Sequence, residues 1–320
     1  MSIKDTILNS LKPVLENSKF VGINQDNIIK LAGKIKDYPL PAWDNTLQLS
    51  SDPKQTAQYY FFLDSINFCF WAEKGKERWS FLKDGEWLQG YYAYSYAIKK
   101  AFEANPNFSM AEFLAKLSFE DFKKIFEGKN QLLLLEERHK IITENFRILA
   151  EKFNGEAANL IQLADNDVNK LVYILLENFP TFQDWVLKGN SKIYFLKRAQ
   201  IFISDLYYAF EGKGLGQFIN MKDLTIFADY KLPQLLQAEG ALEYQGELLS
   251  KIKNEVLIES GSQEEIEIRA NTIYASELLR QELERIGRKL TSNELDWILW
   301  VQAKSTEFLL PFHKTLTINY

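Results

Sequence analysis

Charged side chains interrupt an otherwise apolar stretch between residues 195 and 242. Lys197, Arg198 and Asp205 lie in FLKRAQIFISDL, whose pattern predicts a buried helix with Lys197 and Asp205 on similar faces. Buried charges are costly unless they are paired or used. The residues therefore indicate either an ion-paired cluster in a helical core or a phosphate clamp on a rigid helix.

A single carboxylate follows in the same stretch. Asp229 comes after the apolar run TIFA and precedes a second helical pattern, with Pro233 in its first turn, where proline is tolerated. One interpretation is a simple helix N-cap. The other is a carboxylate that backbone amides hold in place against positive charge in a ligand.

Further polar residues occur in apolar surroundings at both ends of the chain. Asp64 and Asn67 lie, with Trp71, in a run over residues 56–73 that predicts a buried helix. They form either a satisfied polar pair or a hydrogen-bonding edge beside an aromatic platform for a base. His313, between Phe312 and Lys314, is either a packing residue or a ligand contact.

The glycine-rich segment GKGLG at 212–216 could suggest a phosphate-binding loop. Such loops follow a strand and open a helix, whereas a helical pattern precedes this segment. We therefore expect the glycines to end that helix and turn the chain.

Helical periodicity extends over most of the chain, so the elements that position these residues form an all-α fold with one small β-hairpin insertion. The hairpin is predicted from RWSFL and EWLQG, which flank Asp84 and Gly85. We expect one domain over residues 1–320. The predicted helices outside 195–242 cover 2–17, 23–35, 56–73, 90–104, 109–116, 118–126, 134–153, 156–163, 168–179, 182–185, 244–254, 262–288 and 293–303.

Composition excludes several classes of function. A net charge of −5 argues against a general nucleic-acid binder. Two histidines and one cysteine, Cys69, offer no metal spacing and point to a reducing compartment. With no signal-peptide pattern and no run long enough to span a bilayer, we expect a cytoplasmic protein without a membrane, metal or cofactor. Aromatic residues reach 14%, which suits stacking on a planar ligand.

Several stretches together resemble the queuosine salvage family, the queuosine 5'-phosphate N-glycosidase/hydrolases. The resemblance covers most of the chain in family order, with looser similarity in the first 50 residues. It implies an all-α fold similar to the helix-hairpin-helix DNA glycosylases. The matching stretches are DSINFCFWAE (64–73), GYYAYSYAIKKA (90–101), LLEERHKI (134–141), YFLKRAQIFISDLYYAFEGKGLGQF (194–218), LTIFADYKLPQLLQAEGALEY (224–244), EIEIRANTIYASELL (265–279), LDWILW (295–300) and PFHKTLTINY (311–320).

The resemblance also implies a reaction. The family hydrolyses the N-glycosidic bond of queuosine 5'-monophosphate and releases queuine, which is salvaged into tRNA modification. Cleavage builds positive charge on C1' and the ring oxygen. We assign the stabilising carboxylate to Asp229. Whether it acts as a nucleophile or only electrostatically stays open, as does turnover of the nucleoside.

Roles for the other residues follow from their places in the matched stretches. Lys197 and Arg198 are expected to hold the 5'-phosphate. The candidates for the base edge or its cyclopentenediol are Asp64, Asn67, Asp205 and Asp296, and those for stacking are Phe227, Tyr230, Trp71 and Trp297. His313 is a further candidate for contact with the substrate.

Two other classes remain open from the sequence. A non-catalytic queuine or nucleotide carrier would keep the aromatic pocket without a poised Asp229. A true DNA glycosylase is disfavoured by the acidic net charge. We expect a monomer that binds a small molecule and no nucleic acid.

Overall fold

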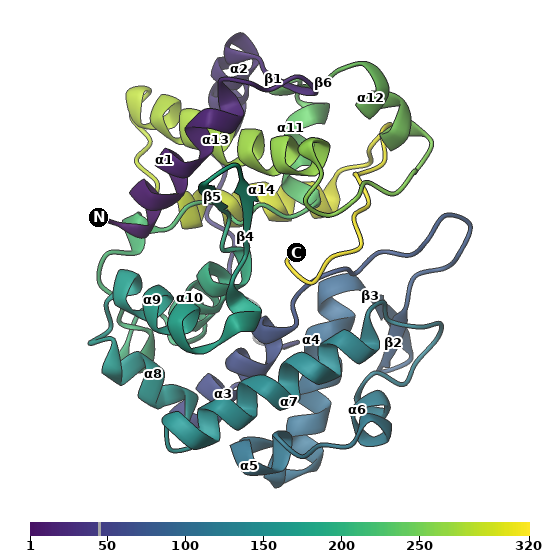
Figure 1. The fold of residues 1–320 in the computed structure, drawn as a ribbon, viewed down its shortest axis with the longest axis vertical. Coiled ribbons are helices and arrows are strands. Elements are labelled where there is room, and N and C mark those ends of the chain that lie inside the picture. The colour runs from purple at the N-terminus through teal and green to yellow at the C-terminus, as the bar shows by residue number, and fades with distance from the viewer. Residues whose placement is uncertain (44–45) are drawn as a thin grey trace.

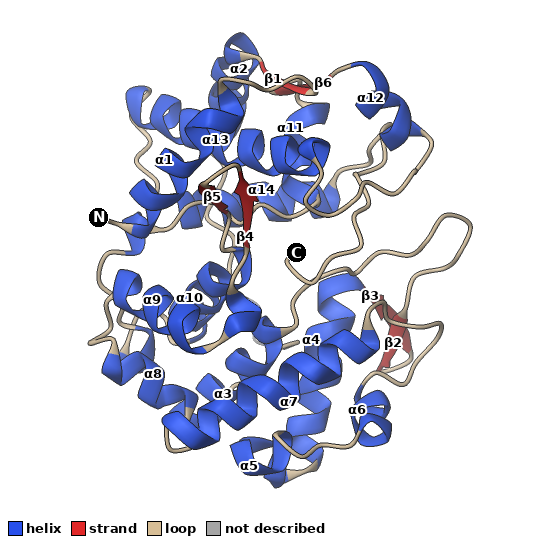
Figure 2. Ribbon diagram, in the orientation of Figure 1, coloured by secondary structure: helices blue, strands red, loops and turns tan. Residues whose placement is uncertain are grey.

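Helices make up most of the protein (Figure 2). The structure is a computed structural model that describes residues 1–43 and 46–320. Over these residues the fold is predominantly helical, as predicted, and no helix among them is long and apolar enough to cross a membrane. The helices are α1 (Ile3–Leu15), α2 (Gln25–Ile35), α3 (Pro53–Ser65), α4 (Gly90–Ala104), α5 (Ala111–Leu114), α6 (Phe119–Ile125), α7 (Leu135–Lys152), α8 (Ala157–Leu163), α9 (Val168–Asn178), α10 (Lys197–Ala209), α11 (Lys231–Ala238), α12 (Gly246–Lys253), α13 (Gln263–Arg285) and α14 (Ser292–Ser305).

The described residues also contain three antiparallel strand pairs, which lie between helices in the chain. The predicted hairpin is β2 (Ser80–Lys83) with β3 (Glu86–Gln89), and β1 (Val21–Ile23) pairs with β6 (Leu242–Tyr244). A hairpin that was not predicted joins β4 (Trp185–Lys188) to β5 (Ser191–Tyr194).

Side-chain caps explain where many helices begin. Asn24 accepts from the backbone amide of Asn27 at the start of α2. Ser118 caps α6, and Thr291 forms a full capping box with Glu294 at α14. Helix α10 ends before the glycine-rich segment, so that segment turns the chain as expected.

The helices form two groups (Figure 1). In one, the N-terminal helices α1 and α2 pack on α13, and α11 packs on α14 and α13. The other is built around α3, which is buried along most of its length and contacts α4, α7, α8 and α10. Helix α10, the β4–β5 hairpin and the C-terminus lie where the two groups meet.

Two predicted helices are wrong in detail. The helix expected over 56–73 ends at Ser65, and the guanidinium of Arg138 donates to the carbonyls of Ile66 and Phe68 in the non-helical segment that follows. The helix expected over 182–185 is instead a 3-10 turn (Pro180–Phe182) followed by strand β4. Gly189, at a φ of +60°, turns the chain between the two strands.

Candidate active site

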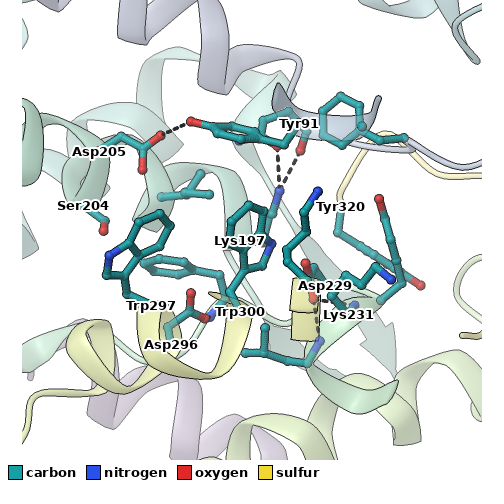
Figure 3. Close-up of a pocket in the computed structure, with 18 of the residues that line it drawn as sticks. Tyr91, Lys197, Ser204, Asp205, Asp229, Lys231, Asp296, Trp297, Trp300 and Tyr320 are labelled. Atoms are coloured by element: carbon teal, nitrogen blue, oxygen red, sulfur yellow. Dashed lines mark hydrogen bonds between the residues drawn. The ribbon is translucent and has the colours of Figure 1, made fainter. Parts of the chain in front are cut away.

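A cavity lies where the two helix groups meet (Figure 3). Its empty volume is about 950 Å³ when the solvent-filled space at its open mouth is included. Of the predicted residues, the structure brings eight to its wall. They are Asn67, Lys197, Asp205, Phe227, Asp229, Tyr230, Asp296 and Trp297.

Helix α11 fixes the position of Asp229. Its Oδ1 accepts the backbone amides of Lys231 at 2.7 Å and Leu232 at 2.9 Å. Among the described residues nothing donates a hydrogen bond to Oδ2, and the side chain lines the cavity. Burial raises the pKa of Asp229, while the amide of Leu232 and the charge of Lys197 oppose that shift. The two sequence interpretations therefore combine, because one oxygen caps the helix and the other remains available.

Lys197 provides a buried cation beside this carboxylate. It is the first residue of α10, and its Nζ donates to the backbone oxygen of Asn67 at 2.7 Å and to Oδ1 of Asn67 at 3.2 Å. Burial lowers the pKa of Lys197 to about 8, and the charge of Asp229 partly restores it. The lysine has no carboxylate ion pair among the residues described. Its charge is therefore available to the cavity.

Two further carboxyl groups line the cavity in apolar surroundings. The hydroxyl of Tyr91 donates to Asp205 at 3.1 Å, and the amide of Phe227 donates to Asp296 at 2.8 Å. Burial raises the pKa of both aspartates well above the usual range, and nearby Asp64 raises that of Asp205 further. Burial therefore favours the neutral form of Asp205.

Three cations meet at one end of the cavity, and the sequence did not indicate them. Arg78, Lys231 and Lys304 come from the segment before β2, from α11 and from α14. None has a carboxylate ion pair among the described residues. Burial and, after it, the charge of Arg78 lower the pKa of both lysines. The pKa of Lys231 falls to about 8. Unpaired cations that repel one another favour an anionic ligand.

Aromatic rings form much of the remaining wall. Trp297 and Trp300 stack with ring centroids 5.5 Å apart, and Trp43 stacks on Tyr208 at the same distance. Tyr320 also lines the cavity. Trp300 and Tyr320 fall within stretches that carried the family resemblance, but nothing in their spacing distinguished them from core aromatics.

Four predicted residues lie away from the cavity. Arg198 is buried and donates to the carbonyls of Ser65 and Thr181, and Asp64 accepts from Asn67 at 3.1 Å within the core. Trp71 lines a separate groove, which shares Arg78 and Lys231 with the cavity. His313 is buried behind the wall, where its Nε2 is 3.2 Å from the hydroxyl of Tyr320. The structure thus gives these four no direct contact with a ligand in the cavity.

Comparison with known proteins shows that the sequence is similar to those of one family. A family described as "Queuosine salvage protein" matches residues 47–320. A protein of Sphaerobacter thermophilus named queuosine 5'-phosphate N-glycosylase/hydrolase is 36% identical over 317 residues, covering 98% of this chain and 97% of the relative. A mouse protein of the same name is 33% identical over 97% of both chains. One of Dictyostelium discoideum is 38% identical over 83% of this chain and 78% of its own.

Proposed function

Because this chain belongs to the queuosine salvage protein family, we propose that it hydrolyses the N-glycosidic bond of queuosine 5'-monophosphate. The products are queuine, available for tRNA modification, and ribose 5-phosphate. The observation that carries the proposal is Asp229. Helix-N-terminal amides hold its Oδ1, and the carboxylate lines the cavity together with cationic and aromatic side chains.

Asp229 meets the electrostatic demand of this reaction. As the bond from C1' to the base breaks, positive charge develops on C1' and the ring oxygen. A carboxylate whose position is already fixed stabilises that charge without reorganisation, a contribution of roughly 10²–10³ in rate. Lys197 favours the ionised form of Asp229 through its charge. We therefore give Lys197 this role in place of the phosphate contact expected from the sequence.

The distribution of charge along the cavity supports one orientation of the bound substrate. The 5'-phosphate lies with Arg78, Lys231 and Lys304, since these cations have no carboxylate partner in the described structure. The deazapurine lies among the aromatic rings, including Trp297 and Phe227. At the end that contains Asp205, the hydroxyl of Ser204 donates to Asn293 at 2.5 Å. A polar cluster of this kind suits the diol of the base.

The leaving group places a further demand on the wall. A 7-deazapurine has no N7 to protonate, so assistance must come from hydrogen bonds to other edges of the base. A neutral Asp205 can donate such a bond while its other oxygen accepts from Tyr91. We assign Asp205 this function, with Asp296 as a second polar contact.

The proposal extends to properties of the whole chain. We infer a single domain over residues 1–320 whose helices are arranged as in helix-hairpin-helix DNA glycosylases, supported by an aspartate at a helix start and a lysine on an earlier helix. We place a monomer in the cytoplasm, acting on a free nucleotide. The lone reduced cysteine and the acidic net charge support this view.

A product assay by mass spectrometry tests the proposal. Purified wild type and Asp229→Asn are incubated with queuosine 5'-monophosphate, with GMP and queuosine as comparison substrates. Asparagine caps helices as well as aspartate does, so the variant loses the charge and keeps the helix start. Release of queuine by wild type, lowered about 10²–10³-fold in the variant, is expected. Tight binding without release by wild type would instead indicate a nucleotide carrier.

A further inference from the structure

A buried ion pair lies directly behind the cavity wall. Asp184 and Arg269 each have about 1% of their side chain exposed. Arg269 donates from two nitrogens to the two oxygens of Asp184, at 2.8 and 2.7 Å. Neither residue lines the cavity. The pair occupies the interior without contacting the proposed substrate.

Asp184 determines how helix α10 begins. Its side-chain Oδ2 accepts the backbone amide of Lys197 at 3.0 Å, and its backbone oxygen accepts those of Phe195 and Leu196. Leu196 has a φ of +55°, which is unfavourable for leucine and needs such support. One residue thus binds three successive amides. The last of them belongs to Lys197, which carries the buried ammonium of the site.

Arg269 connects this helix start to the segment that carries Asp229. Its Nε donates to the backbone oxygen of Ala228 at 3.3 Å, one residue before Asp229. Its guanidinium also lies 4.5 Å from the ring centre of Tyr320, which lines the cavity. A planar group with a fixed fork of donors can hold several partners in one geometry, which an ammonium cannot do.

We propose that Asp184 and Arg269 are positioning residues that fix Lys197 relative to Asp229. The inference rests on the proposed function of Asp229 and adds a buried ion pair that sets the position of Lys197 relative to this carboxylate. Arg269 comes from α13, a helix otherwise distant from the chemistry in sequence, and Asp184 precedes the β4–β5 hairpin. The pair thereby holds α13 against the start of the β4–β5 hairpin and the start of α10.

Arg269→Lys tests the proposal because it keeps the charge and removes the fork. Its kcat is expected to fall about 10²-fold, since small displacements of reacting groups have effects of this size. KM should change much less, because the cavity wall keeps its own residues. The acid limb of the kcat–pH profile should move to higher pH, since a displaced Lys197 favours ionised Asp229 less. Asp184→Asn should show the same pattern.

Glu267→Gln is the matched control on the same helix. Glu267 is buried and accepts the backbone amides of Lys19, Phe20 and Val21, away from the cavity. It should lower the melting temperature and leave both kcat and its pH profile unchanged. Equal changes in Glu267→Gln and Arg269→Lys, or wild-type kinetics in a folded Arg269→Lys, would overturn the positioning role.

The same experiment separates this inference from the proposed function. The wild-type arm reports whether queuine is released at all, and its failure would refute the hydrolase activity. The comparison of variants then addresses the pair alone. If both Arg269→Lys and Asp184→Asn fail to fold, the pair supports the fold as a whole, and its specific positioning role is overturned.

Discussion

The backbone amide of Lys231 donates to Oδ1 of Asp229 at 2.7 Å, while its ammonium lines the cavity at the cationic end. One residue therefore fixes the carboxylate and contributes charge to the proposed phosphate site. Because the first turn of α11 carries both functions, the proposed binding mode has a rigid helix start set the spacing between phosphate and C1'. This arrangement leads to separate tests of the two ends of the substrate.

Replacing the outer cations should affect the phosphate and spare the chemistry. In Arg78→Ala or Lys304→Ala, KM for queuosine 5'-monophosphate should rise about 10- to 100-fold, because each removes one charged contact. Single-turnover rates at saturating substrate should stay near wild type. Arg147→Ala removes a comparably exposed arginine, paired with Glu151 on α7, and should leave KM unchanged. Unchanged KM in both cavity variants would place the phosphate elsewhere.

The alkaline limb of the activity should reflect two lysines with lowered pKa. Burial and the charge of Arg78 bring the pKa of Lys231 to about 8, so this lysine is charged below pH 8 and neutral above it. KM for the phosphate should therefore rise above pH 8, by up to about tenfold per pH unit. Steady-state kinetics between pH 6 and 10 would measure this change.

Lys231→Arg provides the matched test of that limb. Arginine stays protonated throughout this range, so the alkaline rise in KM should disappear. A change in kcat should remain, because burial also lowers the pKa of Lys197 to about 8. If the rise in KM persists in Lys231→Arg, the titrating group is not Lys231.

Asp205 and Asp229 should respond differently to the same substitution. Burial and the nearby Asp64 carboxyl favour the neutral form of Asp205, so we expect Asp205→Asn to preserve both charge state and hydrogen bonding. Its kcat/KM should stay close to wild type, whereas Asp205→Ala should lose about tenfold, the effect of one hydrogen bond. Asp229→Asn, by contrast, removes the charge that we propose stabilises the transition state. A loss in Asp205→Asn as large as in Asp229→Asn would show that Asp205 acts as an anion.

Local sequence patterns were enough to single out Asp229 and Lys197, which the structure places in the cavity wall. A carboxylate after an apolar run and before a helix already indicated Asp229, and a lysine in a buried helix indicated Lys197. The cations at one end of the cavity come from three distant segments, so no spacing relates Arg78 to Lys304. The support of the segment after α3 was equally hidden, since Arg138, which binds the carbonyl of Ile66, lies 72 residues beyond it.

Buried charge can also mislead when sequence alone is available. Arg198 has the same apolar surroundings as Lys197, but its side chain leaves α10 on a different face and donates to core carbonyls. Adjacent residues on a helix point about 100° apart, so only one of the two can face the cavity. The periodicity placed both residues in a helix, and only packing decided between them.

His313 should control the acid stability of the protein. Burial and the charge of Arg269 lower the pKa of its imidazole to about 3. In the unfolded chain a histidine titrates near pH 6.5, so between these values the unfolded state binds the extra proton. The stability that this neutral histidine contributes is full above pH 6.5 and is lost as pH falls towards 3.

Urea unfolding of wild type and His313→Gln between pH 4 and 8 would measure that loss. The wild type should lose up to about 1.4 kcal/mol per pH unit from this residue below pH 6.5. The difference in unfolding free energy between the two proteins should shrink as pH falls, because glutamine does not titrate. KM for the nucleotide should stay unchanged in His313→Gln, since the imidazole lies behind Tyr320. A pH-independent difference, or a raised KM, would contradict a neutral histidine held away from the substrate.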